Sequence, residues 1–319
     1  MFTRRRLKIK LLFIQLLTII PFLIFIFYLF DLWYDARRSQ VLSENLNYTK
    51  LVGENIKDFI VREEVTTQII SEPSFYDTLM KNKEGATLIL ENILAETPEL
   101  YNITIADTNG MILATTLDIP KEQLPSYNMQ DRDYFQEVIK TRQTATSALL
   151  VGKVTNEKLV ISASPVIRNN ELVAVVTTSF EVEKLKNKIE NLLSKSKYAS
   201  KYQIILLDNT GQIVFISDQS LPKEVERSVL INSEFYKRAK QGETYFMENV
   251  YLPIINKKVM GTSISVNSYG WVVISVVPIE EIFAPLVQIQ SIIWLIIGSA
   301  ILFSVAVSSY LIRKIKIVY

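Results

Sequence analysis

The sequence predicts a mixed α/β fold of the α+β type, in which a long N-terminal helix precedes two tandem antiparallel-sheet modules. Three observations lead to this fold class. Two uncharged apolar runs lie near the ends of the 319 residues. A charged segment with helical periodicity follows the first run. A strand-turn-strand pattern then occurs twice at a constant offset of 101 residues, which indicates a duplicated module.

The two apolar runs are predicted to form transmembrane helices at residues 11–30 and 285–312. The twenty residues of the first run, at about 1.5 Å each, match a hydrocarbon core of about 30 Å. The positive-inside rule places residues 1–10 and 313–319 in the cytoplasm and the middle of the chain outside the cell. The basic residues behind this orientation are Arg4, Arg5, Arg6, Lys8, Lys10, Arg313, Lys314 and Lys316.

The charge balance narrows the partners and the chemistry. Between Asp31 and Glu281 lie all 33 acidic residues and 27 of the 35 basic ones, so this part has a net charge of −6. An acidic outer part excludes nucleic acid, whereas the basic ends can contact the lipid bilayer. The sequence has no histidine and no cysteine, which excludes the usual zinc sites, Ser-His-Asp triads and thiol nucleophiles. We expect no metal site and no cofactor.

Residues 31–98 are predicted to form a long helix followed by a helical connector. The segment Asp35–Ile70 has apolar residues at near-helical spacing, and no proline occurs before Pro73. Its apolar stripe is narrow, so we expect it both to lie against its own domain and to pair with its copy in a homodimer. The stripe consists of Leu42, Leu46, Val52, Ile56 and Phe59.

The duplicated module is predicted at residues 99–185, distal to the membrane, and at residues 186–281, proximal to it. In the first copy, an alternating strand leads to a turn at Asp107-Thr-Asn-Gly110, and Asp208-Asn-Thr-Gly211 repeats this turn. The offset also relates Asp133-Tyr-Phe to Glu234-Phe-Tyr. Further strands, in sheets of about five, are predicted at Leu159–Val166, Leu172–Phe180, Val259–Val266 and Trp271–Val277, the last pair joined by the turn Asn267–Gly270.

The segment Tyr127–Phe135 combines an arginine, two aspartates and three aromatic residues after a proline-marked loop. It permits two interpretations. An arginine can form two parallel hydrogen bonds to a carboxylate while aromatic rings exclude water, which would make the segment an anion clamp. Alternatively, Asp131 or Asp133 caps a helix whose aromatic residues face a core, with Arg132 in solvent. The residues alone favour the helix start.

The order of these features resembles the double Cache (dCache) extracytoplasmic sensor domain, over about residues 35–281. The marks are Asp107-x-x-Gly110, Asp131-Arg-Asp-Tyr-Phe135, Ser162-Ala-Ser-Pro165 and Asp208-x-x-Gly211. Bacterial chemoreceptors, sensor histidine kinases and membrane-bound diguanylate cyclases carry this domain. The resemblance implies two PAS-like modules, a bacterial inner membrane, and a small-molecule ligand in the distal module.

The resemblance also implies the residues that bind the ligand. Tyr127, Arg132, Tyr134 and Phe135 come from the region that faces the ligand in the family, with Arg132 suited to a carboxylate. Beside them, Ser147, Lys153, Ser162 and Ser164 lie on or near strands that would back the pocket, although alternating serines also fit a solvated strand face.

Ser179 stands where members that bind amino acids carry an aspartate for the ammonium group. A buried ammonium without a counter-charge costs several kcal/mol, so the serine favours an organic acid over an amino acid as the ligand. If the alignment is shifted by one or two residues, Glu181 supplies the charge instead.

We therefore predict a transmembrane receptor for an extracytoplasmic small molecule, as in the sensory part of a histidine kinase, chemoreceptor or diguanylate cyclase. Residues 313–319 are too few for an output module, so any enzymatic activity would lie in a further C-terminal module, or the receptor signals through a partner. The alternatives are a membrane-anchored binding or assembly protein without signalling output, and an ectoenzyme. The ectoenzyme would need paired carboxylates in a cleft, for which Glu63-Glu64 and Glu280-Glu281 are the candidates.

Overall fold

The computed structural model describes residues 2–120, 122–198, 200–217, 230–266 and 270–315. The chain divides into two compact units. The helical unit consists of Met1–Glu44 and Pro278–Tyr319, and the sheet unit of Asn45–Val277. The predicted turn at Asn267–Gly270 falls mainly outside the described residues, as do residue 1 and residues 316–319 of the predicted cytoplasmic ends.

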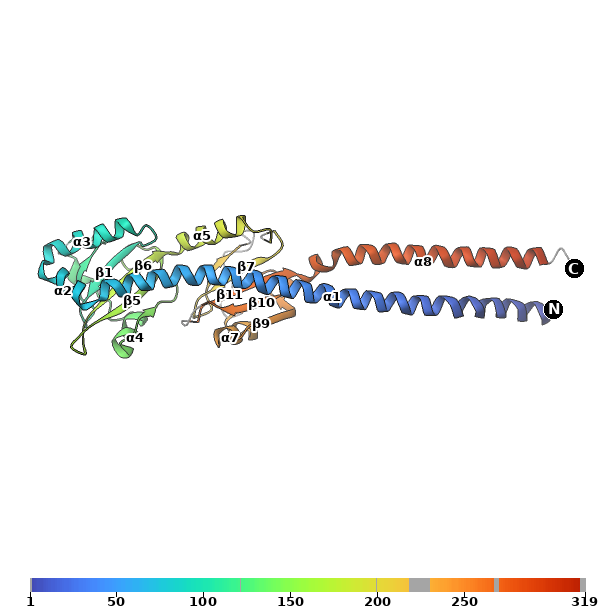
Figure 1. Ribbon diagram of the computed structural model, residues 1–319, viewed down its shortest axis with the longest axis horizontal. Coiled ribbons are helices and arrows are strands. Elements are labelled where there is room, and N and C mark those ends of the chain that lie inside the picture. The colour runs from blue at the N-terminus through green and yellow to red at the C-terminus, as the bar shows by residue number, and fades with distance from the viewer. Residues whose placement is uncertain (1, 121, 199, 218–229, 267–269, 316–319) are drawn as a thin grey trace. The chain divides into compact units, whose positions relative to one another are not determined.

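Two helices form the helical unit: the first part of α1 (Phe2–Ser71) and α8 (Ile279–Ile315). They lie side by side (Figure 1), because Tyr34 stacks on Phe283 with ring centroids 4.3 Å apart and Phe27 meets Trp294 edge-on at 6.0 Å. Among the described residues, one helix is long and apolar enough to cross a membrane, over Ile279–Val307 of α8.

The second part of α1 belongs to the sheet unit and packs along both sheets. The ring of Phe59 meets that of Phe180 edge-on at 5.0 Å. Thr49 and Thr262 share a 2.6 Å hydroxyl contact. Val52, Ile56 and Phe59 of the predicted apolar stripe are buried, whereas Leu42 and Leu46 are only half-buried, and the long N-terminal helix is confirmed. The large buried side chains of this face are Tyr48, Val52, Ile56, Phe59 and Ile60.

The distal module has a six-stranded antiparallel sheet, in which β4 pairs with β5 beside the path β2-β1-β6-β5-β3. Two helices of the predicted connector, α2 and α3, pack against it (Figure 1) through an apolar cluster that includes Leu79 and Leu90. The elements are α2 (Pro73–Lys81), α3 (Lys83–Glu96), β1 (Asn102–Ala106), β2 (Ile112–Thr115), the 3-10 turn η1 (Leu124–Ser126), α4 (Asp133–Thr141), β3 (Ala145–Thr146), β4 (Leu150–Val151), β5 (Lys158–Arg168) and β6 (Glu171–Glu181).

The proximal module repeats this order in a five-stranded sheet, β8-β7-β11-β10-β9. Its core is an apolar cluster under α7 that contains Phe235, Tyr236 and Met247. The helix α5 (Val182–Ser194) connects the modules, and the remaining elements are β7 (Gln203–Leu207), β8 (Ile213–Ile216), α7 (Glu234–Lys240), β9 (Tyr245–Leu252), β10 (Lys257–Ser265) and β11 (Val272–Pro278).

The two modules match at the offset of 101, as the sequence predicts. Ala106 pairs with Ile112 in the first hairpin and Leu207 with Ile213 in the second. Gly110 and Gly211 have φ values of 82° and 78°, which an L side chain adopts only with strain. The first sheet has six strands where about five were predicted, because β3 and β4 are additional two-residue strands. The longer β9 was not predicted either.

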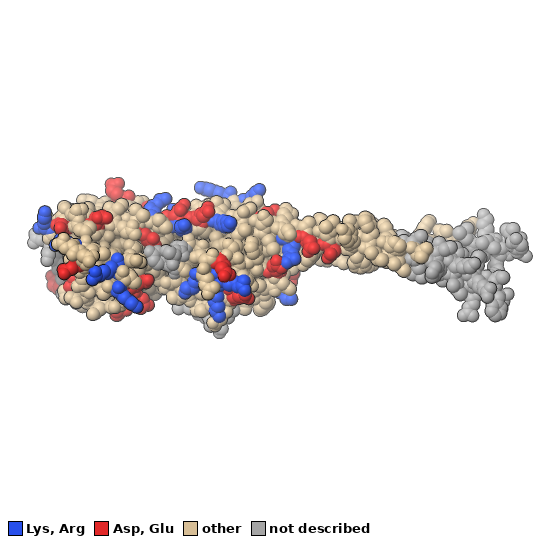
Figure 2. Space-filling model, turned by 60° about the horizontal axis from the view of Figure 1, so that its bottom comes forward, with Lys and Arg blue, Asp and Glu red and all other residues tan. Residues whose placement is uncertain are grey.

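Charged side chains distinguish the two units. On the face that Figure 2 shows, Lys, Arg, Asp and Glu are scattered over the sheet unit, while most of the described surface of the helical unit carries none. Large apolar side chains of that unit are exposed, including Phe25, Leu295 and Phe303. Exposed apolar surface of this extent on two adjacent helices is typical of a lipid-facing segment.

Candidate ligand-binding site

A cavity of about 70 Å³ lies in the distal module, between the sheet, α4 and the segment that follows β4. The residues around it come from every part of the module, although the chain between Tyr127 and Thr155 supplies most of them. They are Asn102, Ile112, Leu117, Tyr127, Asn128, Met129, Arg132, Tyr134, Leu150, Gly152, Lys153, Val154, Thr155, Leu159, Ile161 and Thr177. This set contains two cations and, among the described residues, no carboxylate.

Arg132 reaches the cavity because α4 begins immediately after it. Its backbone is extended, with φ −87° and ψ 131°, and it occupies the N-cap position of α4. The prediction that Asp131 or Asp133 caps this helix was wrong, since Asp133 is the first helical residue and no side chain caps the end. Arg132 as a residue is half-buried, and its Nη2 donates a long hydrogen bond of 3.5 Å to the carbonyl oxygen of Val151.

Lys153 is the second cation, and it is held in place at the edge of the cavity. Its Nζ contacts Asp131 Oδ1 at 2.5 Å and donates to the carbonyl oxygen of Asn128 at 3.0 Å. The hydrogen bond from Lys153 lowers the pKa of the exposed Asp131 carboxyl. Because Asp131 already accompanies Lys153, the guanidinium of Arg132 is the cation better placed to bind a ligand.

The two aromatic residues after Arg132 have different positions. Tyr134 is buried and lines the cavity, and burial raises the pKa of its hydroxyl to about 12, so the hydroxyl stays a hydrogen-bond donor at neutral pH. Phe135 is also buried but belongs to the apolar cluster with Val138 and Ala163, and it does not line the cavity. Both interpretations of this segment therefore describe part of it, a helix start and a cavity wall.

Strand alternation divides the predicted serines between two faces of the sheet. Ser179 lies on the same face of β6 as the cavity residue Thr177, and its hydroxyl donates to Oδ1 of Asn102, which also lines the cavity. Glu181 follows two residues later and is not among the lining residues. No carboxylate from β6 therefore reaches the cavity in the described structure.

Ser147, Ser162 and Ser164 lie outside the lining of the cavity. Ser162 and Ser164 face away from it, with Oγ 3.4 Å from Thr146 Oγ1 and 2.8 Å from Thr144 Oγ1 respectively. The hydroxyl of Ser147 accepts the backbone N–H of Ile161 at 2.9 Å. None of these three serines lines the cavity, so none is placed to contact a ligand there.

Several lining residues were not predicted, notably Asn102, Asn128 and Thr177. Asn102 reaches the cavity because it lies opposite Ser179 in the β1–β6 register. The sequence alone does not reveal this register, so Asn102 could not be predicted. Thr177 could have been found by alternation, two residues before Ser179 on the same strand.

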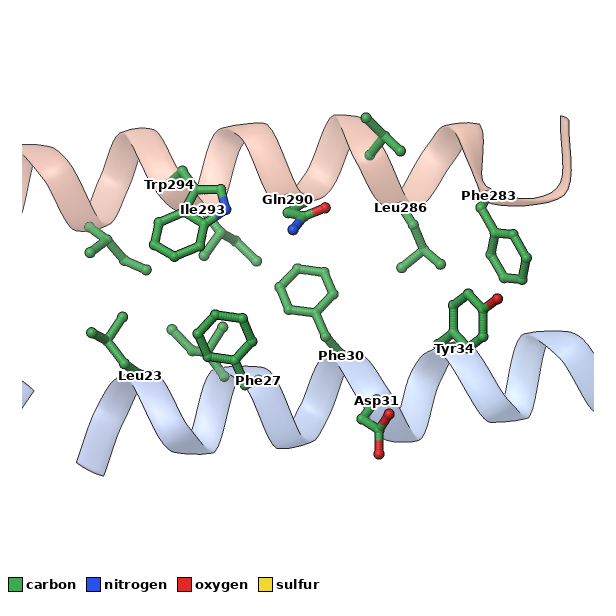
Figure 3. Close-up of a pocket in the computed structure, with 13 residues that line it drawn as sticks. Leu23, Phe27, Phe30, Asp31, Tyr34, Phe283, Leu286, Gln290, Ile293 and Trp294 are labelled. Carbon is green, nitrogen blue, oxygen red and sulfur yellow. The ribbon is translucent and has the colours of Figure 1, made fainter. Parts of the chain in front are cut away.

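A larger cavity of about 360 Å³ lies between α1 and α8 in the helical unit. Figure 3 shows Phe27 of α1 pointing toward Trp294 of α8 and Phe30 toward Gln290, while the side chain of Asp31 points away from α8. Its described lining has no cation and is mostly aromatic or aliphatic. The cavity suits packing of apolar groups and lacks the polar contacts that orient a charged ligand, so we place the candidate site in the distal module.

Fold and cavity together define an extended two-module domain with a cationic pocket in its first module. The sequence matches the Cache domain family, in its dCache form, over residues 34–286. The chain therefore belongs to this family. No curated protein matches the sequence.

Solved structures with the same fold come from receptors. The ligand-binding domain of the Campylobacter jejuni chemoreceptor Tlp3, in complex with L-norvaline, is 15% identical, with a TM-score of 0.57 over 77% of this chain and 94% of that one. The extracellular domain of a protein described as the histidine kinase rpHK1S-Z16 is 14% identical, with a TM-score of 0.58 over 77% and 97%. The corresponding domain of the Pseudomonas aeruginosa chemoreceptor PctB, in complex with L-Gln, is 14% identical, with a TM-score of 0.54 over 76% and 92%.

Proposed function

We propose that this protein is a transmembrane receptor whose distal Cache module binds a small carboxylate outside the cell. The observation that carries the proposal is the charge of the cavity, which has Arg132 and Lys153 in its lining and no carboxylate among the described residues. Arginine can hold a carboxylate through two parallel hydrogen bonds. The complexes of the Tlp3 and PctB domains with amino acids support a role for this fold in binding small molecules that carry a carboxylate.

The ligand class follows from what the cavity offers an amine. An ammonium group would meet the neutral side chains of Asn102 and Thr177 and the two cations. Without a counter-charge, its desolvation would cost several kcal/mol. We therefore infer that the ligand is an organic acid without an amine, in contrast to the amino acids bound by Tlp3 and PctB.

The size of the cavity indicates a short acid. The volume of about 70 Å³ is a little more than twice the roughly 30 Å³ that one water molecule takes up in the liquid, so the cavity suits a ligand of few atoms. Acetate, lactate and pyruvate, which have four to six non-hydrogen atoms, are therefore the acids that we propose to test. The buried hydroxyl of Tyr134, a donor at neutral pH, is placed to bind such an acid together with Arg132.

The proposed membrane arrangement has two spans. The helix over Ile279–Val307 supports the second span, and the apolar run at residues 11–30 of α1 is proposed as the first. With the basic ends in the cytoplasm, the sheet unit lies outside, and displacement of α1 or α8 on ligand binding reaches the cytoplasmic side. We propose that the receptor acts as a homodimer through a surface of α1 other than the predicted stripe, because Val52, Ile56 and Phe59 are buried within the chain.

Titration calorimetry tests the binding function. The full chain in detergent micelles is titrated with acetate, lactate, pyruvate and L-alanine. We expect one of the three acids to bind at least about ten-fold more tightly than L-alanine, because the amine has no partner. Equal or tighter binding of L-alanine would contradict the ligand class.

The Arg132→Ala variant tests the site itself. Loss of a hydrogen-bonded charge partner should weaken binding of the acid by about ten-fold or more. The matched control is Lys140→Ala, which removes a cation at the exposed end of the same helix and should leave the affinity unchanged. Unchanged affinity in Arg132→Ala would show that the acid binds elsewhere.

A further inference from the structure

The same aspartate turn occurs in both modules and builds the same local structure. In the distal module, Asp107 Oδ1 accepts the N–H groups of Asn109 and Met111 at 2.9 and 2.8 Å. In the proximal module, Asp208 Oδ1 accepts those of Thr210 and Gln212, both at 2.9 Å. One carboxylate oxygen is thus sufficient for the turn in each copy.

The second oxygen of Asp208 makes a contact that Asp107 lacks. Asp208 Oδ2 accepts the backbone N–H of Leu149 at 3.0 Å, and Leu149 belongs to the other module. Asp208 is fully buried, whereas Asp107 is partly exposed and its side-chain hydrogen bonds stay within its own turn in the described part of the chain. The extra bond has a charged acceptor in a buried setting, which makes it stronger than a bond between neutral groups.

Three consecutive residues connect this bond to the candidate ligand site. The N–H of Leu149 donates to Asp208, the side chain of Leu150 lines the cavity, and the carbonyl oxygen of Val151 accepts from Arg132. A ligand that engages Arg132 or fills the cavity next to Leu150 therefore acts on the backbone that holds Asp208.

In the proximal module, Asp208 is connected through β7 to β11, and the chain continues from β11 into α8. Asp208 directly follows β7, and the last residue of β7, Leu207, pairs with Val272 at the start of β11. The strand β11 ends at Pro278, and α8 begins at the next residue. In the middle of β11, the hydroxyl of Ser275 accepts a 2.8 Å hydrogen bond from Asn45 of α1.

We propose that the hydrogen bond between Leu149 and Asp208 couples the distal cavity to the proximal module. The proposal rests on the proposed role of the cavity as the ligand site, and it assigns to Asp208 the relay of that site's state to β7 and β11. When the Leu149–Val151 backbone shifts, the geometry of this hydrogen bond changes. The intact and the altered hydrogen bond then favour different conformations of the proximal sheet. The turn of the distal copy has no hydrogen-bond partner among the described residues of the other module, and we assign it no such role.

Hydrogen–deuterium exchange on the full chain in lipid nanodiscs tests the coupling without any ligand. Arg132→Ala serves as the perturbation of the cavity, and the exchange of residues 272–278 in β11 is the readout. We expect Arg132→Ala to change this exchange in the otherwise natural chain and in the Asp107→Asn background. In the Asp208→Asn background the change should be lost, because Asn keeps Oδ1 for the turn but presents an N–H₂ group to the N–H of Leu149.

The amide of Leu149 gives a second readout. Its exchange should be roughly ten-fold faster or more in Asp208→Asn than in Asp107→Asn, since only the former loses its acceptor. Leu149→Pro removes the same donor from the other side and should also abolish the response of residues 272–278. The proposal is overturned if Arg132→Ala leaves β11 unchanged in the natural chain, or if its effect persists in either Asp208→Asn or Leu149→Pro. If none of the acids binds in calorimetry, the proposed ligand site is wrong, but the result of the exchange experiment still stands.

Discussion

Glu63 is a buried carboxyl on α1 with an incomplete set of partners. Its Oε2 has no hydrogen-bond partner in the described part of the chain, and the residue is 3% exposed. Burial, and then the negative charge of Glu99, raise the pKa of Glu63 to about 7, although the cations Arg62, Lys188 and Lys184 act in the opposite direction. The proton that Glu63 retains at mildly acidic pH makes the sheet unit sensitive to pH.

Glu63 should make the folded protein less stable as pH rises. Its pKa is higher in the folded chain than the ordinary value of 4.5, so the folded state holds the proton that the unfolded state releases. The free energy of unfolding should therefore fall between about pH 4.5 and about 7, by at most roughly 1.4 kcal/mol per pH unit, and level off above. Glu63→Gln should match the natural chain at pH 4 and exceed it at pH 8, as measured by urea unfolding in detergent.

Glu64→Gln is the control for this effect. The carboxylate of Glu64 accepts a hydrogen bond of 2.9 Å from the hydroxyl of Thr146. The substitution therefore replaces a charged acceptor that already has a partner by a neutral amide. Burial raises the pKa of Glu64 as well, while the hydrogen bond from Thr146 lowers it, so we expect Glu64→Gln to give a smaller gain in stability at pH 8 than Glu63→Gln. Equal stability of Glu63→Gln and the natural chain at pH 8 would show that water reaches Glu63 and ionises it without cost.

Single residues also show where sequence reasoning reached the site and where it stopped. Arg132 and Tyr134 were predicted because an arginine beside aromatic residues is a recognisable combination in one continuous segment. Asn102 and Thr177 become neighbours of Arg132 only through the pairing of β1 with β6, which brings residues about 75 positions apart together. The serines were assigned by strand position alone, and a shift of one residue places a side chain on the opposite face.

At the level of elements, the exposed face of α1 carries a short apolar stripe. Val61, Val65 and Ile69 are 38%, 45% and 60% exposed and recur every four residues, which places them on one side of the helix. The opposite side of the same turns is buried against the sheets, as for Phe59. A stripe of this kind on a long helix fits a second copy of the same helix in the proposed homodimer.

Val65→Glu should weaken the homodimer. Two copies related by a two-fold axis bring the same stripe together, so one substitution places two carboxylates in an apolar contact. We expect the dimer dissociation constant to rise by about ten-fold or more, as measured by mass photometry in detergent. Thr66→Glu adds the same charge about 100° around the helix and should leave the dimer intact. A dimer that tolerates Val65→Glu would place the interface on another surface.

The elements that the sequence predicted are those with a strong pattern of their own. The paired hairpins combine alternating apolar residues with a turn that needs glycine at positive φ, and both signals are local. The strands β3 and β4 have two residues each and exist because β5 offers hydrogen-bonding groups opposite them. β9 carries exposed Glu248 and Asn249 in its centre, so its apolar alternation is interrupted and its pattern is weak.

Across the whole molecule, the proposed function gives the two copies of a duplicated module different tasks. Both sheets have the same strand order and the same turn, yet the described cavity with cationic lining lies in the first copy. The second copy precedes α8 and bonds to α1 through Asn45. In the receptor that we propose, recognition lies in the first module and transmission in the second, and the hydrogen bond between Leu149 and Asp208 joins them.

The topology of the whole chain gives the last prediction. The sequence has no cysteine, so single substitutions Thr3→Cys, Lys140→Cys and Arg313→Cys introduce unique labelling sites. With two spans and the basic ends inside, a membrane-impermeant maleimide should label only Lys140→Cys on intact spheroplasts, because the exposed end of α4 lies outside the cell. All three variants should react after permeabilisation, which is the control for reactivity. Labelling of Thr3→Cys on intact spheroplasts would mean that the run at residues 11–30 does not span the bilayer in the proposed orientation. The helix α8 would then be the span that anchors the sheet unit to the membrane.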